Sequence, residues 1–299
     1  MLHDICVGVI KIMSNLKEYL KKHQIMVFLV MTFLFSWTFW GIIYASYRGI
    51  LSSTIYGRYF LIFFMLGAFM PSVMSIIING FFYGINGIKT LLKKLTIWKV
   101  KPFFYIVVLL FAPALYYVPL FICNITGAGY KMPSNISNPI SILLNFLLVI
   151  FFGGPLIEEL GWRGFVLPRL QNKLNPIFSS LILGVIWACW HLPLFFFPGT
   201  SQYGCPFVIF IIQCIGLAML FTWVYNQTDG SLLLSIILHA SWNCTEGVIF
   251  LSCLDAFNYF EKYSKYTACF IIMFLIVTLW IIFDMNKKSS NKVKFNIQS

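Results

Sequence analysis

Long apolar stretches, separated by short polar segments, dominate this chain of 299 residues. About 20 apolar residues are enough for an α-helix to cross the ~30 Å hydrocarbon core of a bilayer. A transmembrane β-barrel would need short strands of alternating polarity instead. The pattern therefore predicts an all-α polytopic membrane protein with about eight transmembrane helices. We expect these helices at residues 25–47, 59–80, 103–124, 140–165, 177–197, 206–226, 231–253 and 267–284.

Two basic segments outside these spans have the pattern of interfacial helices. Within residues 1–24, the stretch ICVGVIKIMSNLKEYLKK places apolar and basic side chains on opposite faces of a helix. The connection between the second and third spans, GIKTLLKKLTIWKVKP, is similar. Amphipathic basic helices lie in the membrane interface. We therefore expect one or two interfacial helices besides the spans.

Composition and charge sharpen this interpretation. The chain is 60% hydrophobic and only 10% charged, whereas soluble domains have about 25% charged residues. The net charge of +12 could indicate nucleic-acid binding, but most of the 21 lysines and arginines fall on the side that both termini share. This is the positive-inside distribution. It predicts a multi-pass protein of the cell membrane with both termini in the cytoplasm, with lipids and not nucleic acid as partners.

Candidate chemistry lies in a few polar side chains inside the spans. Ionisable groups within a membrane are costly and usually mark functional sites. The fourth, fifth and seventh spans carry the ionisable groups Glu158, Glu159, Arg163, His191 and His239, and the seventh also carries Asn243 and Glu246. Because a helix rises about 1.5 Å per residue, these groups are expected at similar depths. The spacing therefore favours one buried polar cluster.

The two neighbouring glutamates are expected to differ in role. Glu159 and Arg163 are four residues apart on one helix and can form an ion pair. Glu158 is rotated by about 100° from Glu159, so it is left free to face a cavity. The alternative is that Glu159 and Arg163 form a purely structural pair. The Gly153–Gly154–Pro155 sequence before them predicts a kink, either functional or for packing.

The seventh span carries its polar groups as one stripe. His239, Asn243 and Glu246 are spaced i, i+4 and i+7 and share one helix face. The histidines could alternatively only hydrogen-bond neighbouring helices. Glu246 lies nearer the outer end of its span, where we expect it to face water or a helix end. Whether it contributes to the site stays open.

Three motifs together resemble the CAAX-protease and bacteriocin-processing (CPBP, or Abi) family of intramembrane endopeptidases. They are EExxxR from Glu158 to Arg163, HxxxN from His239 to Asn243, and an FxxxH-like motif from Trp187 to His191. The last departs from the family because tryptophan replaces phenylalanine. The resemblance divides the chain into an amphipathic segment (1–24), a three-span region (25–135), a CPBP-type catalytic core (136–255), and a last span with a basic tail (256–299).

The resemblance implies peptide-bond hydrolysis in a peptide or protein substrate. It assigns Glu158 as the general base that activates water, with His191 helping to hold that water. It assigns the Glu159–Arg163 pair to orienting Glu158. His239 and Asn243 are implied as donors to the tetrahedral oxyanion.

The cofactor is open between none and Zn²⁺. Glu158, His191 and His239 together offer a carboxylate and two imidazoles, a ligand set known from catalytic zinc. The sequence contains no HExxH motif, and we favour the metal-free mechanism. Two other functions fit the same residues, a proton-coupled transporter and a non-catalytic bacteriocin immunity protein. The identity of the substrate and the oligomeric state cannot be read from the sequence.

Overall fold

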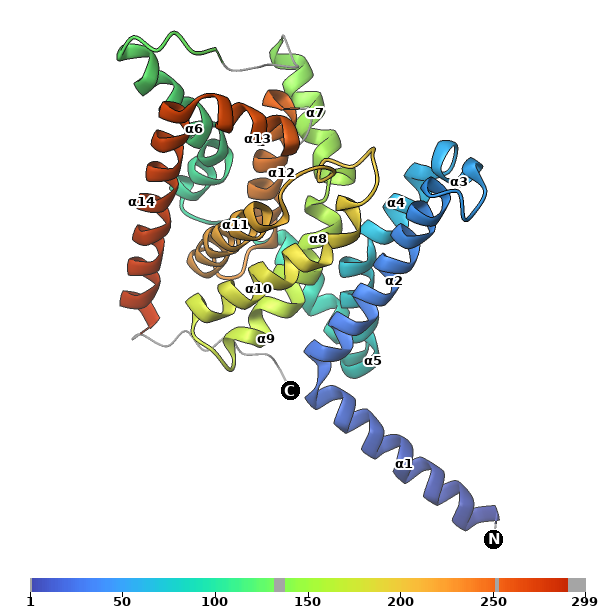
Figure 1. The fold of residues 1–299 in the computed structure, drawn as a ribbon. Coiled ribbons are helices and arrows are strands. Elements are labelled where there is room, and N and C mark those ends of the chain that lie inside the picture. Colours follow the sequence, from blue (N-terminus) through green and yellow to red (C-terminus); the bar gives the residue numbers. More distant parts are fainter. Residues whose placement is uncertain (1, 132–137, 251–252, 290–299) are drawn as a thin grey trace.

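The computed structural model describes residues 2–131, 138–250 and 253–289, and in these residues the regular secondary structure is helical (Figure 1). The first half contains α1 (Leu2–Lys22), α2 (Gln24–Tyr47), α3 (Ser53–Gly57), α4 (Phe60–Ala68), α5 (Met70–Lys93), the 3-10 turn η1 (Lys94–Thr96) and α6 (Pro102–Ile125). The second half contains α7 (Pro139–Phe152), α8 (Pro155–Gly161), the π-helical turn η2 (Trp162–Val166), α9 (Leu167–Gln171), α10 (Pro176–Trp190), the 3-10 turn η3 (Leu192–Phe195), α11 (Phe207–Gln227), α12 (Leu232–Ile249), α13 (Cys253–Lys262) and α14 (Ser264–Ser289).

The predicted all-α polytopic architecture is confirmed, although fewer helices than expected can span a membrane alone. Among the described residues, six segments are long and apolar enough: α2, α6, Pro139–Gln171, α11, α12 and α14. A seventh is α4 together with α5, which meet at an angle of 43°. The fifth expected span, residues 177–197, corresponds to α10, which has only 15 residues. At 1.5 Å per residue it is about 22 Å long, shorter than the ~30 Å hydrocarbon core.

The outer surface of the bundle is apolar, as a lipid-facing surface must be. Helix α7 has no buried residue, and Leu143 and Leu148 on it are about 60% exposed. On α14, Ile276 and Leu279 are exposed to a similar degree. Such continuous apolar exposure would be unfavourable in water but is neutral in lipid. The composition and the surface therefore agree that this is a membrane protein.

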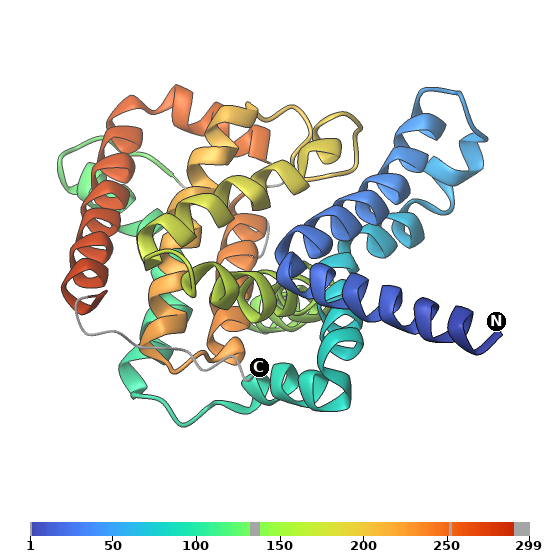
Figure 2. The same ribbon diagram turned by 90° about the horizontal axis from the view of Figure 1, so that it is seen from below.

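Helix α8 lies at the centre of the bundle. It packs against α5 on one side and α12 on the other, and Figure 2 shows α2 and α5 on one flank of this central segment and α11 and α14 on the other. Gly161 permits the close approach, because a Cβ atom there would lie 2.6 Å from the Pro71 carbonyl oxygen of α5. Small residues allow helix backbones to pack closely in membranes. The glutamates of α8 are consequently held inside the protein.

The two expected interfacial segments are partly helical. Helix α1 projects away from the bundle (Figure 1) and exposes Ile12, Met13 and Leu16. After a kink at Gly84, the end of α5 is a separate helical segment that closes with η1, and the chain is not helical again until Pro102. Contact of both segments with the membrane face stays a prediction.

Helix α2 begins and α14 ends at the same end of the bundle (Figure 1). This arrangement agrees with termini on one side of the membrane. Their cytoplasmic orientation stays a prediction.

Candidate active site

A tight turn between helices α7 and α8 places the paired glutamates deep in the bundle. Helix α7 ends at Phe152, and Gly154 has φ of +108°, a conformation that glycine adopts without a Cβ clash. Pro155 then begins α8, in the position where proline is compatible with a helix start. Glu158 thus lies in the first turn of α8, where the helix dipole favours a negative charge. The kink expected at this sequence is present.

Glu159 is the centre of a fully buried ionic group. Its Oε1 atom accepts hydrogen bonds from Arg163 Nη1 and His239 Nδ1, each at 2.8 Å. The Arg163 guanidinium lies between two aromatic rings, with its Cζ atom 3.9 Å from the Phe221 centroid and 4.5 Å from that of Trp187. Cation–π contacts are strongest where the cation is desolvated. The predicted Glu159–Arg163 pair is present, and it additionally fixes His239.

Glu158 has a partner that the sequence did not indicate. Trp187 Nε1 donates a hydrogen bond of 2.7 Å to Glu158 Oε2, and both side chains are buried. The expectation that Glu158 is free was therefore wrong for Oε2. The reason is that α10 packs its indole N–H toward α8, a relationship that only the tertiary structure creates. The second oxygen, Oε1, faces Gly154.

Three polar atoms from different parts of the chain converge on one point beside Gly154. A Cβ atom at this position would lie 2.7 Å from Glu158 Oε1, 3.4 Å from Asn243 Nδ2 and 3.5 Å from His239 Nε2. A carboxylate oxygen, an amide nitrogen and an imidazole nitrogen therefore lie around this Cβ position. The carboxylate can act as a base and the amide as a donor, and His239 Nε2 donates when its ring is protonated.

Asn243 also holds the turn between α7 and α8 in place. Its Nδ2 donates to the carbonyl oxygen of Gly153 at 2.7 Å. Because an amide has two N–H donors, the second one is available for another acceptor. Asn243 thus connects α12 to the turn that precedes Glu158.

His191 lies at the end of α10, and its protonation pattern follows from its backbone contact. Its Nδ1 atom is 2.8 Å from the carbonyl oxygen of Trp187. A carbonyl oxygen only accepts, so Nδ1 carries the proton and Nε2 of the neutral ring is an acceptor. His191 is 7% exposed and His239 is 3% exposed. Neither imidazole faces lipid.

Glu246 belongs to a different cluster. Its Oε1 atom accepts hydrogen bonds from Tyr116 Oη at 2.7 Å and Gln213 Nε2 at 2.8 Å. Glu246 therefore joins α12 to α6 and α11 and does not simply face water or a helix end, because two neighbouring helices supply donors to it.

The candidate metal ligands do not assemble into a metal site. Within the part of the chain that the structure describes, no group of three or more His, Cys, Asp or Glu side chains is arranged to hold a metal ion. Glu158 Oε2 is engaged by Trp187, and Nδ1 of His191 and of His239 by a carbonyl and a carboxylate oxygen, so Glu158 Oε1 and the two Nε2 atoms are the ones that could bind a metal. The metal-free mechanism stays a prediction.

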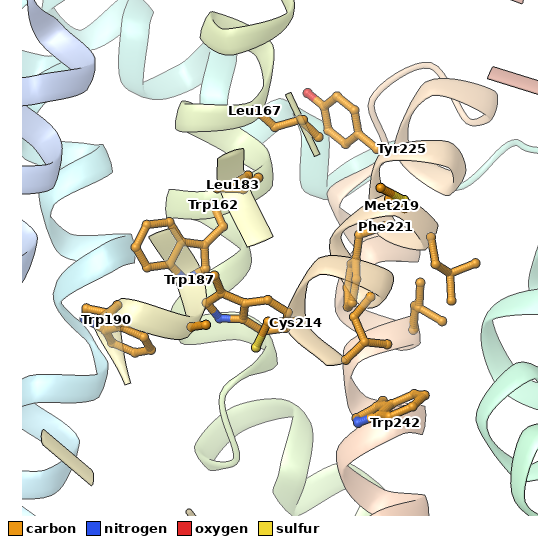
Figure 3. Packing of buried hydrophobic residues seen from close by; sticks show 14 of the residues in the cluster. Trp162, Leu167, Leu183, Trp187, Trp190, Cys214, Met219, Phe221, Tyr225 and Trp242 are labelled. Atoms are coloured by element: carbon orange, nitrogen blue, oxygen red, sulfur yellow. The ribbon is translucent and has the colours of Figure 1, made fainter. Parts of the chain in front are cut away.

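Trp187 and Phe221 are the site residues that sequence patterns missed. Figure 3 shows Trp187 among buried aromatic side chains, with Trp190 and Trp162 on one side and Phe221 on the other. The departure from the FxxxH motif was a usable signal for Trp187, because a buried indole N–H needs an acceptor. No sequence pattern indicated Phe221.

The fold and this cluster define a polytopic membrane protein with a buried carboxylate–imidazole–amide site. Residues 140–245 match the family model of type II CAAX prenyl endopeptidase Rce1-like proteins. CAAX prenyl protease 2 of Methanococcus maripaludis is 27% identical over 147 residues, which cover 37% of this chain and 53% of that protein. Lysostaphin resistance protein A of Staphylococcus haemolyticus is 21% identical over 168 residues, covering 52% of this chain and 41% of that protein.

These comparisons confirm the resemblance to the CAAX-protease and bacteriocin-processing family that the three motifs indicate. The matched segment contains Glu158, His191 and Asn243 together with the other motif residues. The chain spans about half the length of the curated relatives that it matches.

Proposed function

We propose that this protein is an intramembrane endopeptidase that hydrolyses a peptide bond with water activated by Glu158. The observation that carries this proposal is the convergence of Glu158 Oε1, His239 Nε2 and Asn243 Nδ2 around one point beside Gly154. Amide hydrolysis requires a positioned base and donors directed at the developing negative charge. This site offers both in a buried environment.

In the first step, Glu158 Oε1 removes a proton from water while the water oxygen attacks the carbonyl carbon of the substrate. The C=O π electrons move onto the oxygen and give a tetrahedral oxyanion. Asn243 donates to this oxyanion with its remaining N–H, and protonated His239 donates from Nε2. The Glu159 carboxylate at Nδ1 stabilises the positive charge of that imidazolium.

In the second step, the oxyanion re-forms the carbonyl and the C–N bond breaks. The protonated Glu158 returns its proton to the leaving amine nitrogen, which regenerates the carboxylate. His191 holds the water before attack, because its Nε2 atom accepts a hydrogen bond while Nδ1 is bound to the Trp187 carbonyl. Water is the only co-reactant.

The substrate class that we propose is a membrane-associated or exported peptide or protein. The site lies among apolar helices of a membrane protein, which supports a substrate that enters the membrane or lies against it. The relative from Methanococcus maripaludis is named a CAAX prenyl protease, which supports a substrate cut near a membrane anchor. Besides its substrate, the protein would contact membrane lipids. It would lie in the cell membrane with both termini in the cytoplasm.

A second candidate is a resistance protein that acts without cleavage. The similarity to a protein named for lysostaphin resistance favours it. The two candidates differ in one consequence, because a non-catalytic protein keeps its phenotype when the proposed base is replaced.

The deciding experiment compares membrane and secreted peptides from cells that carry the wild type or Glu158→Gln. Glutamine still accepts the Trp187 N–H through its amide oxygen but cannot take a proton from water. We expect at least one uncut peptide to accumulate in the variant at equal protein abundance. Identical peptide patterns would overturn the protease proposal, and an unchanged resistance phenotype would favour the second candidate.

A further inference from the structure

Among the hydrogen bonds of the described residues, the indole of Trp187 donates the one that reaches the side chain of the proposed base, Glu158. Tryptophan at this position departs from the family's FxxxH consensus. Trp187 is 4% exposed, so its N–H would be left unsatisfied without an acceptor. Indole is a donor and never an acceptor of hydrogen bonds. Glu158 Oε2 satisfies it at 2.7 Å, a distance typical of charge-assisted hydrogen bonds.

This hydrogen bond restricts a torsion that is otherwise soft. Rotation of a glutamate carboxylate about its last torsion angle has a broad energy profile. Once Oε2 is bound to the indole, Oε1 is the oxygen directed at the point shared with His239 and Asn243. The indole thereby selects which oxygen meets the water and fixes its direction.

The rest of Trp187 holds other parts of the site at the same time. Its carbonyl oxygen accepts from His191 Nδ1, and its ring lies against the Arg163 guanidinium and perpendicular to the His239 ring. Phenylalanine, the residue of the family motif at this position, could retain the carbonyl and ring contacts. It lacks the N–H, which is therefore the chemical group that distinguishes this chain.

We infer that Trp187 is a positioning residue for the proposed hydrolysis, because its indole N–H orients the Glu158 carboxylate for attack on water. This inference rests on the proposed endopeptidase function. Loss of the indole N–H is expected to lower kcat and not to weaken substrate binding, because Trp187 acts through Glu158. A misplacement of about 1 Å in a reacting group can lower a rate about 100-fold.

The test is Trp187→Phe, assayed on a quenched fluorescent copy of the peptide that accumulates uncut in Glu158→Gln cells. We expect kcat to fall about 10- to 100-fold with KM unchanged. The matched control is Trp223→Phe. Trp223 Nε1 donates to the Asp284 carboxylate at 2.9 Å, away from the site, and its ring is also 4% exposed. The control variant should retain the wild-type kcat.

A purely structural role would lower thermal stability in both variants and leave kcat per folded molecule unchanged. If Trp187→Phe is poorly folded, benzothienylalanine at position 187 replaces the N–H by sulfur and keeps the bicyclic shape, and the same loss of kcat is expected. A wild-type kcat in the folded variant would overturn the inference while leaving the protease proposal intact. Absence of cleavage by the wild-type protein would overturn both.

Discussion

Gly154 and Glu158 are so close that the glycine has no room for a side chain: a Cβ atom on Gly154 would lie 2.7 Å from Glu158 Oε1. Separations this short do not occur between non-bonded carbon and oxygen atoms in contact. His239 Nε2 and Asn243 Nδ2 also lie within 3.5 Å of this Cβ position. We therefore place the attacking water next to Glu158 Oε1, on the side that faces His239 and Asn243.

Gly154→Ala should abolish cleavage. The methyl group would displace Glu158 Oε1, and alanine is strained at the φ of +108° that the turn requires. We expect cleavage of the peptide identified with Glu158→Gln to fall at least 100-fold. Gly247→Ala on α12 is the control, because its Cβ would meet nothing within 4 Å. Equal activity of the two variants would contradict the assigned position of the reacting groups.

Replacing the two adjacent glutamates by glutamine should have different consequences. Glu159→Gln leaves the buried Arg163 cation without its carboxylate, and breaking a buried ion pair destabilises a protein by about 3–5 kcal/mol. Glu158→Gln keeps an acceptor for Trp187 and should retain most of the stability. Denaturant unfolding in detergent micelles measures both changes. The assignment is wrong if Glu158→Gln is the less stable variant.

Asn243→Ala should reduce kcat while leaving KM nearly unchanged. Removal of one oxyanion donor costs about 100- to 1000-fold in kcat, and the variant also loses the hydrogen bond to Gly153. Asn145→Ala on α7 is a suitable comparison, because its amide donates to Cys244 Sγ at 3.5 Å and not to the site. A rise in KM alone would assign Asn243 to substrate binding instead.

Removal of metal ions should not abolish activity. The proposed mechanism activates water with Glu158 and stabilises the oxyanion with His239 and Asn243, so it needs no metal ion. We expect purified protein treated with a chelator to retain full turnover at zinc contents well below one ion per chain. Loss of activity that stoichiometric Zn²⁺ restores would establish the metal-dependent alternative.

The sequence was most informative where the determining interactions are local. Apolar length predicted an all-α membrane protein, and the i, i+4 spacing predicted the Glu159–Arg163 ion pair that the structure contains. Gly153, Gly154 and Pro155 predicted the kink because glycine and proline restrict the backbone in known ways. The expected eight spans exceed the six to seven candidates among the described residues, because α10, although apolar, is too short to cross a membrane alone.

Only the tertiary structure decided which groups meet across helices. His239 lies 80 residues from Glu159 yet binds the same oxygen as Arg163, and Trp187 reaches Glu158 from 29 residues away. These contacts depend on the rotation and depth of each helix, and one residue of shift turns a side chain by about 100°. The amino-acid pattern thus determined which polar groups the membrane protein encloses, whereas helix packing determined which oxygen of Glu158 faces His239 and Asn243.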